Sequence, residues 1–198
     1  GAGYDTGYIG KWHLASHKYH GAVPRELQGG YKSWLGANLL EFTSDAYDTH
    51  LWDQDGKEHT LPGYRVDAQT DAAIRYMRED RDHPYFLFLS YLEPHHQNNS
   101  DNYPAPEGYE EAYASAPLPA DLVGQGGTVP QHWPGYCGMI KRLDEALGGR
   151  AARHRGRVRR PRPAASDRAR PARSRPELGA LGVLARGDGF RARAGLRR

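Results

Sequence analysis

The feature that most constrains the fold is a helical pattern followed directly by a short, continuous apolar run. Over residues 64–80, apolar side chains recur at the spacing of one helix face: Val66, Thr70, Ala73, Ile74 and Met77. Residues 85–92 then read Y-F-L-F-L-S-Y-L, the length and composition of a strand buried on both faces. A helix that leads into such a strand predicts an α/β fold with a mainly parallel sheet.

Three other segments add detail to this prediction. Residues 49–52 and 58–61 flank Asp55-Gly56, a dipeptide that favours a tight turn, and so predict a two-stranded hairpin. Residues 102–134 are rich in proline, glycine and alanine and predict a long surface loop. Residues 136–147 predict a second amphipathic helix, with Met139, Ile140, Leu143 and Leu147 along one stripe.

The first chemically informative segment is the opening stretch, residues 3–14, which reads G-Y-D-T-G-Y-I-G-K-W-H-L. Its residue types favour a strand, and side chains on a strand alternate between faces. Lys11 and His13 should therefore share one face, with Trp12 anchored on the other. An ammonium beside an imidazole can neutralise a sulfate or phosphate group, and the imidazole can also transfer a proton.

The same stretch resembles the second signature motif of the sulfatases, in which Gly-Tyr-x-Thr leads into Ile-Gly-Lys-Trp-His-Leu. The resemblance implies an alkaline-phosphatase-like α/β hydrolase domain over residues 1–149. It also implies that Lys11 holds the sulfate oxygens and steadies the nucleophile, and that His13 orients the nucleophile or accepts its proton. The expected substrate is a sulfate ester, either a small molecule or a carbohydrate.

Residues 93–98, E-P-H-H-Q-N, follow the predicted inner strand, at the edge where ligands collect in parallel sheets. A Pro-His pair at this place is similar to the sulfatase pattern, and His95 is the matching position. The resemblance implies that His95 binds the sulfate group. His96 and Asn98 are predicted to contact substrate, although neighbouring side chains on an extended chain diverge.

Two parts of the sulfatase pattern are missing from these 198 residues. Members of the family carry a nucleophile, matured to formylglycine, in a Cys/Ser-x-Pro-x-Arg motif. Cys137, Ser115 and Ser174 all lack the required arginine four positions later, and Cys137, beside an apolar stripe, is interpreted as a structural thiol. The family also implies a divalent cation, usually calcium, but its aspartate motifs are absent and no metal ligand is predicted. We therefore expect an incomplete catalytic domain that is inactive by itself.

The retained cationic groups do not distinguish sulfur from phosphorus. A phosphodiesterase, phosphonate hydrolase or phosphoglycerol transferase of the same superfamily therefore stays open as an alternative. A Thr in the nucleophile segment would argue for phosphoryl chemistry. No window approaches the roughly 18 consecutive apolar residues of a membrane-spanning helix, so we expect no membrane partner.

The composition changes abruptly near residue 150. Residues 1–150 hold 12 basic and 21 acidic residues, a net charge of −9, whereas residues 151–198 hold 15 and 3, a net charge of +12. Residues 150–198 are dominated by Arg, Ala, Gly and Pro, and a disordered basic tail is predicted. Such a tail could bind nucleic acid or another polyanion. We favour an origin by frameshift in GC-rich coding sequence, and do not expect a nucleic-acid partner.

Overall fold

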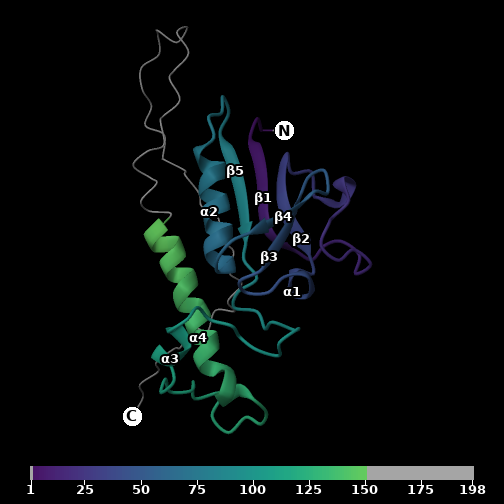
Figure 1. Cartoon of the computed structure of the whole chain (residues 1–198). Helices are drawn as coiled ribbons and strands as arrows, with labels where there is room; N and C mark the ends of the chain where they lie inside the picture. The colour runs from purple at the N-terminus through teal and green to yellow at the C-terminus, as the bar shows by residue number, and fades with distance from the viewer. Residues whose placement is uncertain (1, 151–198) are drawn as a thin grey trace, which may run out of the picture.

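The computed structural model describes residues 2–150, so the predictions made for the basic tail lie outside the described residues. Five strands and several helices follow one another along this part of the chain (Figure 1). In order they are β1 (Asp5–Trp12), η1 (Arg25–Leu27), β2 (Ser33–Asn38), α1 (Leu40–Thr43), β3 (Thr49–Asp53), β4 (Glu58–Leu61), α2 (Arg65–Arg78), β5 (Tyr85–Ser90), α3 (Tyr109–Ala112), α4 (Val129–Glu145) and η2 (Ala146–Arg150).

The five strands form one sheet in the order β4-β3-β2-β1-β5. Strand β1 pairs in parallel with both β2 and β5, whereas β3 pairs antiparallel with β2 and with β4. The α/β class is therefore confirmed, but the prediction of a mainly parallel sheet is wrong because the sheet is mixed. The predicted hairpin is the cause: it turns at Gly56, where φ is 82°, and its first strand joins the edge of β2.

Helix α2 covers one face of the sheet and an aromatic layer covers the other. Ala73 and Tyr76 of α2 pack with Ile9 of β1 and Leu87 of β5. On the opposite face, residues of β1, β2 and β5 form a cluster of rings: Tyr8, Trp12, Trp34 and Phe88, with Tyr31 beside them. The helix predicted over residues 64–80 is thus confirmed. It forms here because its apolar stripe packs against the sheet.

The close approach of β1 and β5 requires a glycine. At Gly10, φ is 113°, and a Cβ atom there would lie 1.9 Å from the carbonyl oxygen of Ser90. No side chain fits in that space, so this residue lets the two parallel strands approach each other at their carboxyl ends.

Strand β5 is confirmed in position but not in burial. In the described part of the chain it is the edge strand of the sheet, and of its six residues Leu87 alone is fully buried. Phe86 is 43% exposed. The expectation of burial on both faces was wrong because a continuous apolar run does not reveal whether a strand is central or at an edge.

The last helix also departs from its prediction. Helix α4 begins at Val129, seven residues before the predicted start, and short helix α3 lies within the predicted loop. Pro130 is compatible with this start because the first turn of a helix needs no backbone N–H donors. Met139 is fully buried as expected, but Ile140 is 42% exposed and does not belong to the buried stripe.

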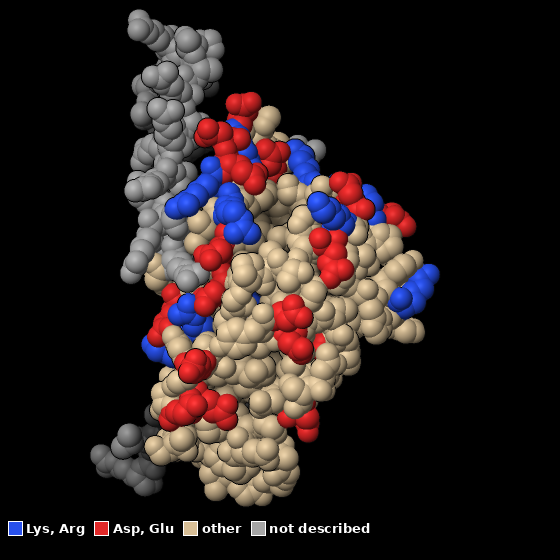
Figure 2. Space-filling model, in the orientation of Figure 1, with Lys and Arg blue, Asp and Glu red and all other residues tan. Residues whose placement is uncertain are grey.

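Within residues 2–150, no helix has the length and apolar character needed to cross a membrane. Figure 2 shows acidic side chains spread over the visible face of the molecule and basic ones mostly at its upper end.

Candidate active site

The carboxyl ends of β1, β2 and β5 meet at one edge of the sheet, the lower edge in Figure 1, where α1 also lies. Strand β1 occupies the centre of this parallel group, because the chain adds β2 on one side of it and later β5 on the other. Such a reversal of direction opens a crevice beyond the carboxyl ends of the strands. Lys11 lies near the end of β1, His13 directly follows this strand, and His95 lies five residues after the end of β5.

Lys11 and His13 share one neighbour, as their predicted common face requires. The Nζ atom of Lys11 lies 3.0 Å from Oε2 of Glu41, and Nδ1 of His13 lies 3.9 Å from Oε1 of the same carboxylate. Trp12 points the other way, into the aromatic layer, where its ring centroid is 4.9 Å from that of Tyr8. Because neighbouring side chains of a strand alternate, the buried indole places Lys11 on the opposite face of β1.

Glu41 reaches this position through an unusual turn after β2. Leu39 has a φ of 56°, and its N–H donates to the carbonyl oxygen of Trp12 at 3.2 Å. The chain then enters α1, in which Leu40 is fully buried and the Glu41 side chain is 4% exposed. The contact with Lys11 is an ion pair without hydrogen-bond geometry, since Oε2 of Glu41 has no hydrogen-bond partner.

The charges around Glu41 keep its carboxyl ionised. Burial raises the pKa of this group, but its own backbone N–H, the Lys11 ammonium and the His95 imidazole together lower the pKa below its ordinary value of 4.5. His95 therefore belongs to the same electrostatic neighbourhood as Lys11. Glu41 thus contacts Lys11 and His13 directly, and its carboxyl is also influenced by His95.

The His95 ring has a defined tautomer. Its Nδ1 lies 2.5 Å from the carbonyl oxygen of His96, and because a carbonyl only accepts, Nδ1 carries a proton and donates it. The Nε2 atom remains for other contacts. It can accept a hydrogen bond when the ring is neutral and donate one only when the ring is protonated.

His96 and Asn98 lie apart from this cluster. The Nε2 atom of His96 contacts Oδ1 of Asp101 at 2.9 Å, and its ring centroid is 5.3 Å from that of Tyr103 and 6.5 Å from that of His132. Adjacent histidines thus point to different neighbours. Asn98 is exposed in the turn that follows.

A buried polar network holds the segment that carries His95 against α1. The Nε atom of Arg65 donates to Oε1 of Glu93 at 2.8 Å, and both side chains are fully buried. Both terminal nitrogens of Arg65 donate to Oε1 of Gln97 at 3.1 Å. The Nε2 atom of Gln97 in turn donates to the backbone oxygen of Glu41 at 2.9 Å. His95 lies between Glu93 and Gln97 in the sequence. The network therefore holds both the segment that carries His95 and the helix α1 that carries Glu41.

Sequence reasoning missed Glu41, Arg65 and Gln97. Glu41 follows Leu39 and Leu40, and the only local signal was an acidic residue within an apolar stretch. Arg65 sits in the first turn of α2, where a basic residue is normally solvated. No pattern in the sequence distinguishes such a residue from its exposed counterparts.

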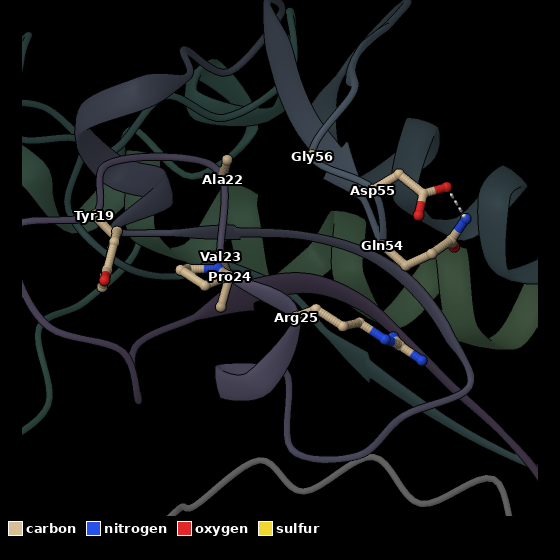
Figure 3. A pocket seen from close by; sticks show the side chains of 8 residues that line it. All are labelled: Tyr19, Ala22, Val23, Pro24, Arg25, Gln54, Asp55 and Gly56. Atoms are coloured by element: carbon tan, nitrogen blue, oxygen red, sulfur yellow. Dashed lines mark hydrogen bonds between the residues drawn. The ribbon is translucent and has the colours of Figure 1, made fainter.

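A surface hollow of about 550 Å³ lies elsewhere, between residues 19–25 and the β3–β4 turn (Figure 3). Its charged lining consists of Arg25 and Asp55, and none of the cationic residues of the sheet edge borders it. Gln54 donates to Asp55 at 3.2 Å within the same turn. The hollow is therefore separate from the cluster around Glu41.

Cys137 does not have the environment of a nucleophile. The thiol is free and half-buried on α4, and burial raises its pKa. A raised pKa reduces the thiolate fraction on which nucleophilic attack depends. The prediction of a structural thiol agrees with this environment.

The fold and this edge define an α/β protein with a cationic cluster beyond the carboxyl ends of its central strands. The sulfatase family model matches residues 1–149, about three quarters of the chain, and the chain belongs to the sulfatase family.

Relatives of known sequence agree with this assignment. The chain is 28% identical to the ulvan-active sulfatase of Formosa agariphila, over 74% of this chain and 28% of that protein. It is 33% identical to the N-acetylglucosamine-6-O-sulfatase of Bacteroides thetaiotaomicron, over 48% of this chain and 15% of that protein. It is 32% identical to the uncharacterized sulfatase YidJ of Escherichia coli, over 57% of this chain and 24% of that protein. The chain thus spans between 15% and 28% of the length of these relatives.

Solved structures show the same fold. A Bacteroides thetaiotaomicron protein described in connection with the metabolism of multiple glycosaminoglycans superposes with a TM-score of 0.62 at 19% identity, over 78% of this chain and 36% of that one. The YidJ structure from Bacteroides fragilis superposes with a TM-score of 0.61 at 20% identity, over 78% of this chain and 38% of that one.

Calcium, which the sulfatase family typically binds, does not fit the donors at this edge. Calcium takes six to eight oxygen ligands. The cluster offers the carboxylate of Glu41, and that group is already close to an ammonium and two imidazoles. Across residues 2–150 no three His, Cys, Asp or Glu side chains are grouped to hold a metal ion. The residues described at this edge therefore do not fit a calcium ion.

Proposed function

We propose that this chain is the part of a sulfuric ester hydrolase that binds the sulfate group. The observation that carries the proposal is the contact of Lys11 and His13 with one carboxylate, Glu41, at the carboxyl edge of β1, with His95 lowering the pKa of the same carboxyl. Preorganised cationic donors of this kind stabilise the charge that develops on a tetrahedral oxyanion.

Each of the three residues has a distinct proposed role. The Lys11 ammonium, whose side chain is 15% exposed, binds the sulfate oxygens and steadies the nucleophile. His13 is 57% exposed at the rim and orients the nucleophile or accepts its proton. His95 presents Nε2 to the sulfate group while Nδ1 stays bound to the carbonyl of His96.

The proposed substrates are sulfated carbohydrates. Two curated relatives are named for such activity, one on ulvan and one on the 6-O-sulfate of N-acetylglucosamine. His96 and Asn98 lie just beyond His95 and would contact the remainder of the substrate. The half-buried rings of Tyr103 and His132 beside His96 offer apolar surface for a sugar ring.

We propose that the chain does not turn over substrate by itself. None of its 198 residues provides a Cys/Ser-x-Pro-x-Arg nucleophile motif, and the described donors do not fit calcium. An assay with 4-nitrophenyl sulfate and added calcium tests this point. Clear release of 4-nitrophenolate by the purified chain would contradict it.

Binding of the same ester tests the site directly. The expected result is saturable binding of 4-nitrophenyl sulfate to the full chain, followed by NMR titration, with the largest shifts at His13 and His95. Lys11→Ala and His95→Ala should each weaken binding. Lys32→Ala and His59→Ala are matched controls, because these residues pair with Asp5 and Asp53 away from the site. Equal affinity in all five proteins would refute the proposal.

A phosphoryl-transfer relative of the same superfamily remains the second candidate. The cationic donors that support sulfate binding would serve a phosphate ester equally well. Sulfate esters and phosphate esters differ more in net charge than in shape. Glu41, the acidic residue at the centre of the cluster, is therefore relevant to how the site distinguishes them.

A further inference from the structure

Glu41 gives the proposed anion site an internal negative charge. A site built only to attract anions would gain from having no carboxylate, yet Glu41 Oε2 lies 3.0 Å from the Lys11 ammonium. The two formal charges cancel.

Glu41 cannot readily leave the site to make room for a ligand. Its side chain is 4% exposed, and the preceding Leu40 is fully buried. Its backbone oxygen accepts a hydrogen bond at 2.9 Å from Gln97, which is itself held by Arg65. Moving α1 would break this buried network, so a bound ligand has to share the Lys11 ammonium with the carboxylate.

An oxyanion in contact with the Lys11 ammonium would therefore lie close to Glu41. Two contacts of about 3 Å to one ammonium place the two anions roughly 4 to 6 Å apart. At that separation each additional negative charge on the ligand is repelled appreciably, even in a partly solvated site. The repulsion is therefore about twice as large for a ligand with two negative charges as for a ligand with one.

We propose that Glu41 is a specificity-determining residue that makes the site select singly charged tetrahedral esters over doubly charged ones. Sulfate monoesters carry one negative charge, as do phosphate diesters, whereas phosphate monoesters carry two near neutral pH. The inference rests on the proposed function, because it concerns the ligand of that same site. The lowered pKa of Glu41 supports it, since the carboxyl keeps its charge over the neutral range.

The test compares three esters that share one leaving group. 4-Nitrophenyl sulfate and methyl 4-nitrophenyl phosphate carry one charge, and 4-nitrophenyl phosphate carries two at about pH 8, well above its second pKa near 6. With the full chain, the two singly charged esters should bind with similar affinity and the phosphate monoester about tenfold more weakly. Because this comparison uses the unmodified protein, it does not depend on whether a variant folds.

Glu41→Gln then removes the charge and keeps the shape. It should raise the affinity for 4-nitrophenyl phosphate by about tenfold relative to 4-nitrophenyl sulfate. Glu41→Asp should keep the preference of the unmodified chain. Glu58→Gln is the matched control, since Glu58 also pairs with a histidine, His50, but on β4 at the far edge of the sheet.

The outcomes separate this inference from the proposed function. If the sulfate ester binds but Glu41→Gln leaves the affinity ratio unchanged, the selectivity role of Glu41 is wrong and the anion site stands. A merely structural role would lower the affinity for all three esters equally and would also overturn the inference. If none of the esters binds the unmodified chain, both proposals fail.

Discussion

The ammonium of Lys11 and the carboxylate of Glu41 lie 3.0 Å apart although they belong to different elements, the end of β1 and the short helix α1. The whole of β2 lies between them in the sequence. Parallel pairing of β1 with β2 brings their carboxyl ends to the same edge, and the turn at Leu39 then directs α1 back across the end of β1. The pair thus links the fold to the proposed anion site.

Replacing Lys11 should destabilise the protein as well as weaken ester binding. In Lys11→Met, the nearly buried carboxylate of Glu41 loses its ion-pair partner, so the free energy of unfolding should fall by about 2 kcal/mol. Urea denaturation measures this change. In the double variant Lys11→Met/Glu41→Gln, most of the loss should be recovered because no buried charge remains. If the two single changes simply add, the two side chains are not energetically coupled.

Arg65 should be among the residues least tolerant of substitution. Arg65→Met leaves Glu93 as an unpaired buried charge and removes both donors to Gln97, so a loss of about 3 to 5 kcal/mol in unfolding free energy is expected. Arg75→Met is the matched control, because Arg75 is exposed on the same helix and its loss should cost less than about 0.5 kcal/mol. Similar midpoints for the two variants in urea denaturation would contradict the importance of the buried network.

The Arg65 network should also control His95. Where Arg65→Met still folds, Gln97 no longer ties the segment after β5 to α1, and the NMR signals of His95 should shift. Those of His59, at the distant hairpin, should not. Unchanged His95 signals in a folded variant would show that the network stabilises the fold without orienting the histidine.

Gly10 should not tolerate any side chain. In Gly10→Ala the Cβ atom would meet the Ser90 carbonyl oxygen at 1.9 Å and the backbone would keep a φ of 113°, so we expect a loss of about 4 kcal/mol or failure to fold. Gly3→Ala is the control. Its φ of 77° is also positive, but nothing lies within 4 Å of the added atom, and about 1 kcal/mol is expected. Thermal or urea unfolding distinguishes these values.

The acid sensitivity of the fold should depend on Glu41. Because the folded protein lowers the pKa of this carboxyl below 4.5, its ionised form stabilises the fold above that pH, and the contribution disappears as pH falls through the lowered pKa. Glu41→Gln should therefore show a shallower loss of unfolding free energy below about pH 4.5. The lowered pKa values of Asp5, Asp53 and Glu145 act equally in both proteins and cancel. Parallel pH profiles would contradict the assignment.

Local patterns determined several features of this protein. The apolar stripe of α2, the Asp55-Gly56 turn and the apolar run of β5 were readable because each depends on residues close in sequence. The alternation of a strand likewise placed Lys11 and His13 on one side and Trp12 on the other. The sulfatase motif over residues 3–14 indicated the family for the same reason, since it is a run of consecutive residues.

Tertiary structure alone decided the rest. Whether β5 is an edge strand, and whether the β3–β4 hairpin makes the sheet mixed, depends on pairings between distant segments that no local pattern encodes. Glu41 and Arg65 look in the sequence like ordinary surface charges. They become the centre of the proposed site and its buried support because the strands place their carboxyl ends together, and the fold buries these charged side chains beside partners of opposite charge.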